Sequence, residues 1–262
     1  MAKRQRIWNE TKYRRYIKEG RGQGDGAKYI PWIMIQDFPS LGIVSRVKGS
    51  KTGRIHHFLS NNEMRLFFIL DWSDEILDIR EQYPLLELSE VIDISEKARI
   101  NYPYDNKSGF PYVLTSDFYL NTTSGAAVIS VKTISELENL RVREKLEIER
   151  RYWTKRGVKW QIVTEREINQ TKAANIEWLS QAGDLACAGI PPELFSCCCG
   201  YFIQNIKNYK SKIGNLIDEI EKKFGLSTGI GLNIYKYLAY RKMIDFDADR
   251  ELDFSTFTVR RV

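Results

Sequence analysis

Alternation of hydrophobic and polar residues predicts a β-hairpin near the middle of the chain. The segments 115–120 and 127–132 both follow a period of two and are rich in β-branched or aromatic residues. The segment 121–126 between them is polar and contains Gly125, which allows a turn. We therefore expect two antiparallel strands joined by a short loop.

The chemistry of this hairpin depends on its register. If the loop is centred between Thr123 and Ser124, paired positions sum to 247, and Asp117 lies opposite Ser130. Lys132 then lies one step further along the same face of the second strand. The hairpin would thus bring a carboxylate and a lysine together.

A helix preceding the hairpin supplies a second acidic residue. Glu63 shares a stripe with Leu66, Phe67 and Leu70, spaced as one face of an α-helix. This spacing turns the Glu63 carboxylate toward the buried face. An alternative interpretation is a capping box, because Ser60 stands three residues before Glu63.

The remaining pattern up to residue 167 predicts an α/β domain with a mixed sheet. Segment 77–84 is typical of a strand that ends in a proline, whereas 87–110 is polar and irregular, typical of an insertion. Segment 134–156 predicts one long amphipathic helix with Gly157 as its C-cap, and 159–164 predicts a further strand. This order predicts an α/β domain with a mixed sheet over residues 1–167.

Residues 168–262 predict a smaller, mostly helical, winged-helix-like domain. Asn169 caps one helical segment, and a second one spans 194–209. Segment 213–224, a turn at 225–228 and a helix ending at Met243 form a helix-turn-helix pattern. The strands of a wing are expected at 244–246, 252–254 and 257–259. The second helix offers only Lys236, Arg241 and Lys242 as basic residues, so docking to a protein and binding to DNA both remain open.

Composition is that of a globular protein without a membrane span. The chain has 262 residues, 43% of them hydrophobic and 28% charged, and its longest apolar run, 66–70, is too short to cross a bilayer. The four cysteines, Cys187 and 197–199, do not form spaced pairs, which argues against a zinc site. Reduced thiols and a cytoplasmic location are the expectation.

Positive charge is concentrated in two segments. Residues 1–21 contain eight basic residues and two acidic ones, out of 40 and 34 in the whole chain, so the remainder carries 32 of each. Such a segment suits contact with a phosphate backbone, although a merely solvated helix has the same composition. A second group precedes the Glu63 helix and predicts a DNA-contacting edge. It consists of Arg46, Lys48, Lys51 and Arg54.

Two carboxylates and a lysine suit metal-dependent hydrolysis of a phosphodiester. Mg²⁺ takes oxygen ligands and keeps several waters, so one or two protein carboxylates suffice for each ion. A lysine ammonium can orient the attacking water or neutralise charge that develops on the phosphate. Glu63, Asp117 and Lys132 supply this combination.

Seven ordered motifs resemble the TnsA family, the endonuclease subunits of heteromeric cut-and-paste transposases. The motifs are Glu-Gly-Arg-Gly-Gln-Gly at 19–24, Tyr-Ile-Pro-Trp at 29–32, Lys-Thr-Gly-Arg-Ile-His-His at 51–57, Leu-Asp-Ile-Arg-Glu-Gln-Tyr-Pro-Leu-Leu at 77–86, Thr-Ser-Asp-Phe at 115–118, Val-Lys at 131–132 and Glu-Lys-Leu-Glu-Ile-Glu-Arg-Arg-Tyr-Trp at 144–153. The resemblance implies a restriction-endonuclease-like catalytic domain of the PD-(D/E)xK type, and the order of elements over residues 1–167 agrees with it. It also implies catalytic positions for Glu63, Asp117 and Lys132, which favours the catalytic interpretation of Glu63 over the cap.

The resemblance implies further properties of the site. Ser130 stands where many nucleases of this type have an acid, and it becomes a weak candidate metal ligand beside Glu63 and Asp117. Glu149 is a candidate that could supply the missing charge. Mg²⁺ is the expected cofactor, with Mn²⁺ as a substitute.

The resemblance also implies a place in a larger complex. The subunit would cut the 5′ ends of a transposon while a TnsB-like DDE transposase cuts and joins the 3′ ends. The C-terminal domain would contact a TnsC-like ATPase regulator. Two alternatives remain open: a catalytically inert adapter subunit of the same complex, and a stand-alone restriction or repair nuclease.

Overall fold

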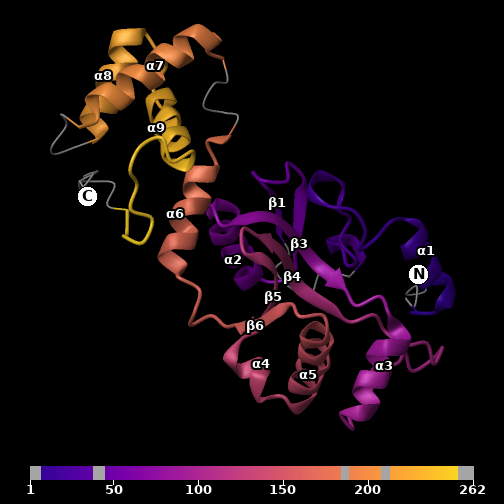
Figure 1. Cartoon of the computed structure of the whole chain (residues 1–262). Helices are drawn as coiled ribbons and strands as arrows, with labels where there is room; N and C mark the ends of the chain where they lie inside the picture. Colours follow the sequence, from indigo (N-terminus) through magenta and orange to yellow (C-terminus); the bar gives the residue numbers. More distant parts are fainter. Residues whose placement is uncertain (1–6, 38–44, 184–188, 208–212, 253–262) are drawn as a thin grey trace, which may run out of the picture. The chain divides into compact units, whose positions relative to one another are not determined.

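The fold is taken from a computed structural model, which describes residues 7–37, 45–183, 189–207 and 213–252. The chain forms two compact units, Met1–Ile168 and Asn169–Val262 (Figure 1). The first is α/β and the second is helical, as the sequence predicts. Each unit is described by itself below.

A four-stranded mixed sheet is the framework of the first unit. Its strands lie in the order β3 (Ile76–Pro84), β4 (Thr115–Thr122), β5 (Gly125–Val131) and β6 (Lys159–Val163). β3, β4 and β5 run antiparallel, whereas β6 is parallel to β5. The mixed sheet is therefore confirmed, with β4 and β5 at its centre.

The register of the β4–β5 hairpin is the one expected from its loop. Phe118 pairs with Ile129 and Tyr119 with Val128, so paired positions sum to 247. Asp117 follows directly on this ladder, beside the end of β5. The pattern left a slip of two residues open, and the structure confirms the register with the loop centred between Thr123 and Ser124.

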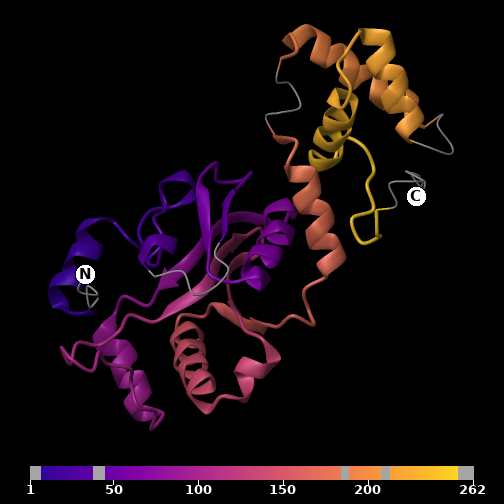
Figure 2. The same ribbon diagram turned by 180° about the vertical axis from the view of Figure 1, so that it is seen from behind.

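Hydrophobic residues cover both faces of the sheet. On one face, α2 (Asn61–Trp72) packs through Leu66 and Phe67, and the pair β1 (Ser45–Lys48) and β2 (Ile55–Phe58) adds Phe58. On the other face, α5 (Leu140–Lys155) packs through Ile148 and Trp153. Figure 2 shows these layers from behind. The centre of the sheet is thereby shielded from water, which makes any charged group there costly.

Two segments differ from the prediction. Residues 87–110 were expected to be irregular, but α3 (Leu88–Lys97) lies within them and buries Val91 and Ile94. The long helix expected over 134–156 is two helices, α4 (Ile134–Glu138) and α5, because Asn139 adopts an extended conformation and caps α5. The break at Asn139 therefore sets where α5 begins.

The aromatic residues of the N-terminal segment belong to a core. α1 (Glu10–Lys18) buries Tyr16 beside Trp8 and Trp32, and the short 3₁₀ turns η1 (Gly26–Lys28) and η2 (Ile35–Asp37) follow. Arg21 is also buried, with its guanidinium 2.5 Å from Asp37. These aromatic rings are thus not available to stack on DNA bases.

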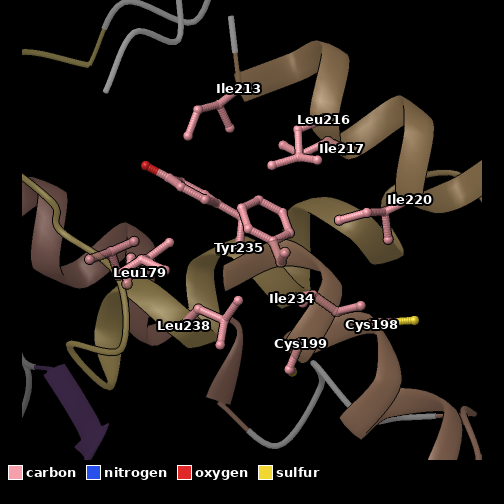
Figure 3. Packing of buried hydrophobic residues seen from close by; sticks show 13 residues of the cluster. Leu179, Cys198, Cys199, Ile213, Leu216, Ile217, Ile220, Ile234, Tyr235 and Leu238 are labelled. Carbon is pink, nitrogen blue, oxygen red and sulfur yellow. The ribbon is translucent and has the colours of Figure 1, made fainter. Parts of the chain in front are cut away.

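The described residues of the second unit form four helices: α6 (Gln170–Ser180), α7 (Pro192–Asn205), α8 (Ile213–Phe224) and α9 (Ile230–Tyr240). Asn169 caps α6, as expected. Figure 3 shows the apolar residues that gather between these helices, with Leu216 of α8 and Leu238 of α9 fully buried. Gly231 allows α8 and α9 to pack closely, because a Cβ at this position would lie only 3.0 Å from Ile217, tighter than an ordinary contact.

The predicted wing is only partly within the described residues. Residues 244–246 form no strand, which corrects that part of the prediction, and Ile244 packs instead on the helical core. The other two expected strands reach into residues 253–262, outside the described ranges. Lys236 of α9 is buried over the Trp178 ring at 4.2 Å, so it is not presented to DNA.

Neither unit contains, in the ranges described above, a helix of the length and apolar character needed to cross a bilayer. Of the cysteines in the same ranges, Cys197 is exposed, while Cys198 and Cys199 are buried in the core of the second unit.

Candidate functional site

Asp117 and Lys132 meet at the end of the β4–β5 hairpin. The Asp117 Oδ2 atom accepts a hydrogen bond from Lys132 Nζ at 2.7 Å and another from the Val131 backbone N–H at 2.7 Å. Asp117 is only 8% exposed. The predicted grouping of the acid and the lysine is therefore present in the structure.

Three carboxylates act on the lysine. Burial alone would lower the pKa of Lys132, but Asp117 raises it, and Glu149 and Glu63 add to this effect, so the pKa lies above its usual value. The lysine is thus held charged in a largely buried position. Its surroundings carry more negative than positive charge.

Glu63 is both a residue of the helix cap and a buried carboxylate. Ser60 caps α2 by accepting from the Glu63 N–H, and the Glu63 carboxylate accepts from the Ser60 hydroxyl at 2.9 Å and from the Leu59 N–H at 3.1 Å. Burial, followed by the negative charge of Asp117, nevertheless raises the pKa of Glu63 to about 7. Glu63 is therefore a capping residue that also belongs electrostatically to the Asp117 site.

Gln82 of β3 ties Glu63 to the start of β4. Its amide donates to Glu63 Oε2 at 3.2 Å, and its carbonyl oxygen accepts from Thr115 Oγ1 at 3.3 Å. Gln82 is buried and has a φ of 49°, a left-handed conformation that is unfavourable for a residue with a side chain. Such strain is characteristic of functional sites. The pattern of residues 77–84 predicted a strand and did not indicate this conformation.

Glu149 enters the site from α5. Its Oε1 atom accepts from the Ser130 hydroxyl at 2.5 Å, and Ser130 in turn accepts from Trp160 Nε1 at 3.2 Å. Burial raises the pKa of Glu149 to about 7, against the opposing effect of hydrogen bonds from Ser116 and Ser130. Ser130 is therefore a hydrogen-bonding partner of Glu149, and its assignment as a candidate metal ligand stays a prediction.

A pocket of about 340 Å³ opens onto these groups. Asp117 and Lys132 line it together with Glu149 and Lys145 of α5, and Tyr112 and Thr115 line it from the segment that leads into β4. Glu63 and Ser130 do not line it. The pocket thus gives a ligand access to the hairpin end and to the inner face of α5.

The four residues predicted to contact DNA separate into two groups. Arg46 and Lys48 are exposed on β1, and Lys51 is half-buried. Arg54 is a correction: its guanidinium is buried and forms two hydrogen bonds to Glu81, at 2.8 and 2.5 Å. Arg54 therefore neutralises an acid inside the protein and is not presented to DNA.

Glu81 is the centre of this buried network. Burial would raise its pKa, but the hydrogen bonds from Arg54 and then His56 lower it to about 2. His56 Nδ1 lies 2.8 Å from Glu81 Oε2, and its Nε2 lies 2.8 Å from Thr52 Oγ1. The histidine thus has a hydrogen-bonding role, and the network joins β2 to β3.

The mixed sheet, the helices on both faces and an acid paired with a lysine on adjacent strands define a protein of the restriction-endonuclease-like class. Two family models match the chain: "TnsA-like endonuclease N terminal" over residues 73–165 and "TnsA endonuclease C terminal" over residues 167–248. The first match includes Asp117, Lys132 and Glu149, whereas Glu63 precedes it.

A curated relative matches in addition. The chain is 43% identical over 182 residues to "Transposon Tn7 transposition protein TnsA" of Escherichia coli. The alignment covers 68% of this chain and 66% of that protein, slightly under two thirds of the relative's length. With both family models matched, the chain belongs to the TnsA endonuclease family.

Proposed function

We propose that the chain is the endonuclease subunit of a transposase and hydrolyses one phosphodiester bond at each 5′ end of its transposon. One observation carries the proposal: Lys132 is hydrogen-bonded to Asp117 and lies in the field of Glu149 and Glu63. The pocket at this point gives a DNA strand access to the lysine. Family membership supports a nuclease as the class of enzyme.

The donor set fits a hard divalent cation such as Mg²⁺. Asp117 and Glu149 offer carboxylate oxygens at one pocket, and burial raises the pKa of Glu63 and of Glu149 to about 7. Buried carboxylates of this kind are stabilised in the ionised form by a nearby cation. Asp117 and Glu149 would hold Mg²⁺ or Mn²⁺, with Glu63 close by. The ion would supply Lewis acidity toward the phosphate.

In this proposal Lys132 acts on the phosphate, and hydrogen bonds within the protein orient the two carboxylates. Lys132 neutralises charge on the phosphate oxygens as the bond breaks, because its raised pKa keeps it protonated at neutral pH. The Val131 N–H and Lys132 hold Asp117 in one orientation. Ser130 holds Glu149 in the same way.

Partners follow from the family as part of the proposal. The Escherichia coli relative is named a transposition protein of Tn7. We expect this chain to act on transposon-end DNA with a TnsB-like DDE transposase subunit and a TnsC-like ATPase regulator. The second unit, which matches the C-terminal family model, is the part expected to contact the regulator.

Strand-specific cleavage of end-labelled transposon-end DNA tests the proposal. The chain is combined with the partner transposase, the regulator and Mg²⁺, and wild type is compared with Asp117→Asn, which keeps the shape of the buried side chain. We expect loss of the 5′-side cuts with the 3′-side cuts retained. Undiminished 5′-side cutting by the variant would exclude this hairpin as the active site.

A second candidate function is an inert adapter that has kept the fold. One observation favours it: among the described residues, no three His, Cys, Asp or Glu side chains stand close enough together to hold one metal ion. Calorimetric titration with Mn²⁺ separates the two candidates. Binding that disappears in Asp117→Asn supports the nuclease, whereas no binding that depends on Asp117 supports the adapter.

A further inference from the structure

Lys145 lies on the face of α5 that lines the pocket. Val142, Lys145, Leu146 and Glu149 all line it, at spacings of three and four residues that place them on one side of the helix. Lys145 therefore stands one helical turn before Glu149, in the lining of the pocket that also contains Asp117 and Lys132.

Lys145 differs from most basic residues of its helix. Arg141 is paired with Glu144, and Arg150 and Arg151 are paired with Glu147. Arg143 forms no such pair among the described residues, but it does not line the pocket. Lys145 lines the pocket, and its partly exposed side chain has no hydrogen bond or ion pair to any residue that the structure describes. Instead, burial of part of the side chain, followed by the positive charges of Arg141 and Lys132, lowers the pKa of Lys145.

The acids near Lys145 are already engaged. Glu149 accepts from Ser130, and Glu136, which also lines the pocket, accepts from the Thr133 N–H at 2.8 Å as the cap of α4. An ammonium held near a second ammonium without a carboxylate of its own suits an anion that arrives with the ligand. Because Lys145 and Lys132 line the same pocket, the ligand that suits it carries at least two negative charges, one for each lysine.

We propose that Lys145 binds the phosphate next to the scissile phosphate on the strand that is cut. The inference rests on the proposed function, because it assigns the cleaved strand to this pocket. Lys132 faces the scissile phosphate at the hairpin end, and Lys145 binds its neighbour along the wall formed by α5. Two lysines that line one pocket would thus fix the position of a single strand.

Strand-specific cutting under single-turnover conditions provides the first test, in the same reconstituted complex. We expect Lys145→Ala to lower the 5′-side cleavage rate at subsaturating DNA by about 10- to 100-fold, the effect of removing one charge-assisted hydrogen bond. Lys145→Arg should restore most of it. The matched control is Arg143→Ala, which removes an exposed basic residue of α5 that does not line the pocket and should change the rate less than twofold.

Substrates with one neutral methylphosphonate linkage identify the contacted phosphate. Neutralising the neighbouring phosphate should slow wild type and Arg143→Ala by about the same 10- to 100-fold and have little further effect on Lys145→Ala. If the methylphosphonate linkage slowed wild type, Arg143→Ala and Lys145→Ala equally, the inference would be overturned. A wild-type cleavage rate for Lys145→Ala on unmodified DNA would overturn it as well. A parallel reaction with Asp117→Asn separates failure of the Lys145 contact from failure of the proposed function. Unchanged cutting by Asp117→Asn refutes the proposed function itself.

Discussion

Glu149→Gln is expected to stabilise the first unit at alkaline pH while impairing cleavage. The Glu149 side chain is buried at the edge of the pocket, and this burial raises its pKa from the ordinary value of 4.5 to about 7. Because the folded pKa is above the unfolded one, ionisation disfavours the folded state. Glutamine has nearly the same shape and no charge, so it removes this penalty.

The magnitude follows from linkage. A difference of about 2.5 pKa units corresponds to roughly 3 kcal/mol, which is almost absent at pH 4 and almost fully developed at pH 8. We expect the stability difference between Glu149→Gln and wild type to grow in favour of the variant by about 2–3 kcal/mol over this range. For a unit of this size, that is a gain in melting temperature of roughly 5–10 °C at pH 8.

Thermal unfolding without divalent ions, followed by tryptophan fluorescence at several pH values, measures this difference. Five of the six tryptophans lie in the first unit, so the signal reports mainly on it. Glu147→Gln is the control, because Glu147 lies on the same helix but is paired with Arg150 and Arg151. A stability difference that does not change between pH 4 and pH 8 would refute the burial argument for Glu149.

Two further predictions concern residues that the sequence placed wrongly or missed. Arg54→Ala should destabilise the first unit by about 3–5 kcal/mol in unfolding by denaturant, because it leaves Glu81 buried without its main partner. Arg46→Ala should leave that stability unchanged and weaken DNA binding. Equal loss of stability in both variants would contradict this prediction. Gln82→Gly should relieve the strained φ and keep stability within about 1 kcal/mol of wild type, yet slow cleavage by about tenfold, since Glu63 loses a donor. Normal cleavage by Gln82→Gly would exclude a positioning role for Gln82.

Short-range patterns predicted much of the fold correctly. The alternation in β4 and β5 and the polar turn between them determine the pairing of Phe118 with Ile129, so the meeting of Asp117 and Lys132 could be expected from local sequence. Helical spacing and the Ser60 cap determine α2 in the same way. Both depend on neighbours within a few residues.

The errors arose where a residue's environment is set by distant segments. Arg54 looks like a surface cation in sequence, and only its pairing with Glu81 on another strand removes it from the surface. The hydrogen bond from Ser130 to Glu149 likewise depends on a distant helix, α5, and could not be expected from the sequence around Ser130. The position of Lys145 on the same helical face as Glu149, in contrast, follows from their spacing of four residues.

Diffraction from Mn²⁺-soaked crystals, with the anomalous signal of manganese recorded, tests the central claim most directly. The account predicts a manganese peak bound by Asp117 and Glu149 in wild type, and no peak there in Asp117→Asn crystals of unchanged fold. A manganese ion bound elsewhere in the first unit, in a protein that still cuts transposon ends, would contradict the assignment of this pocket as the active site.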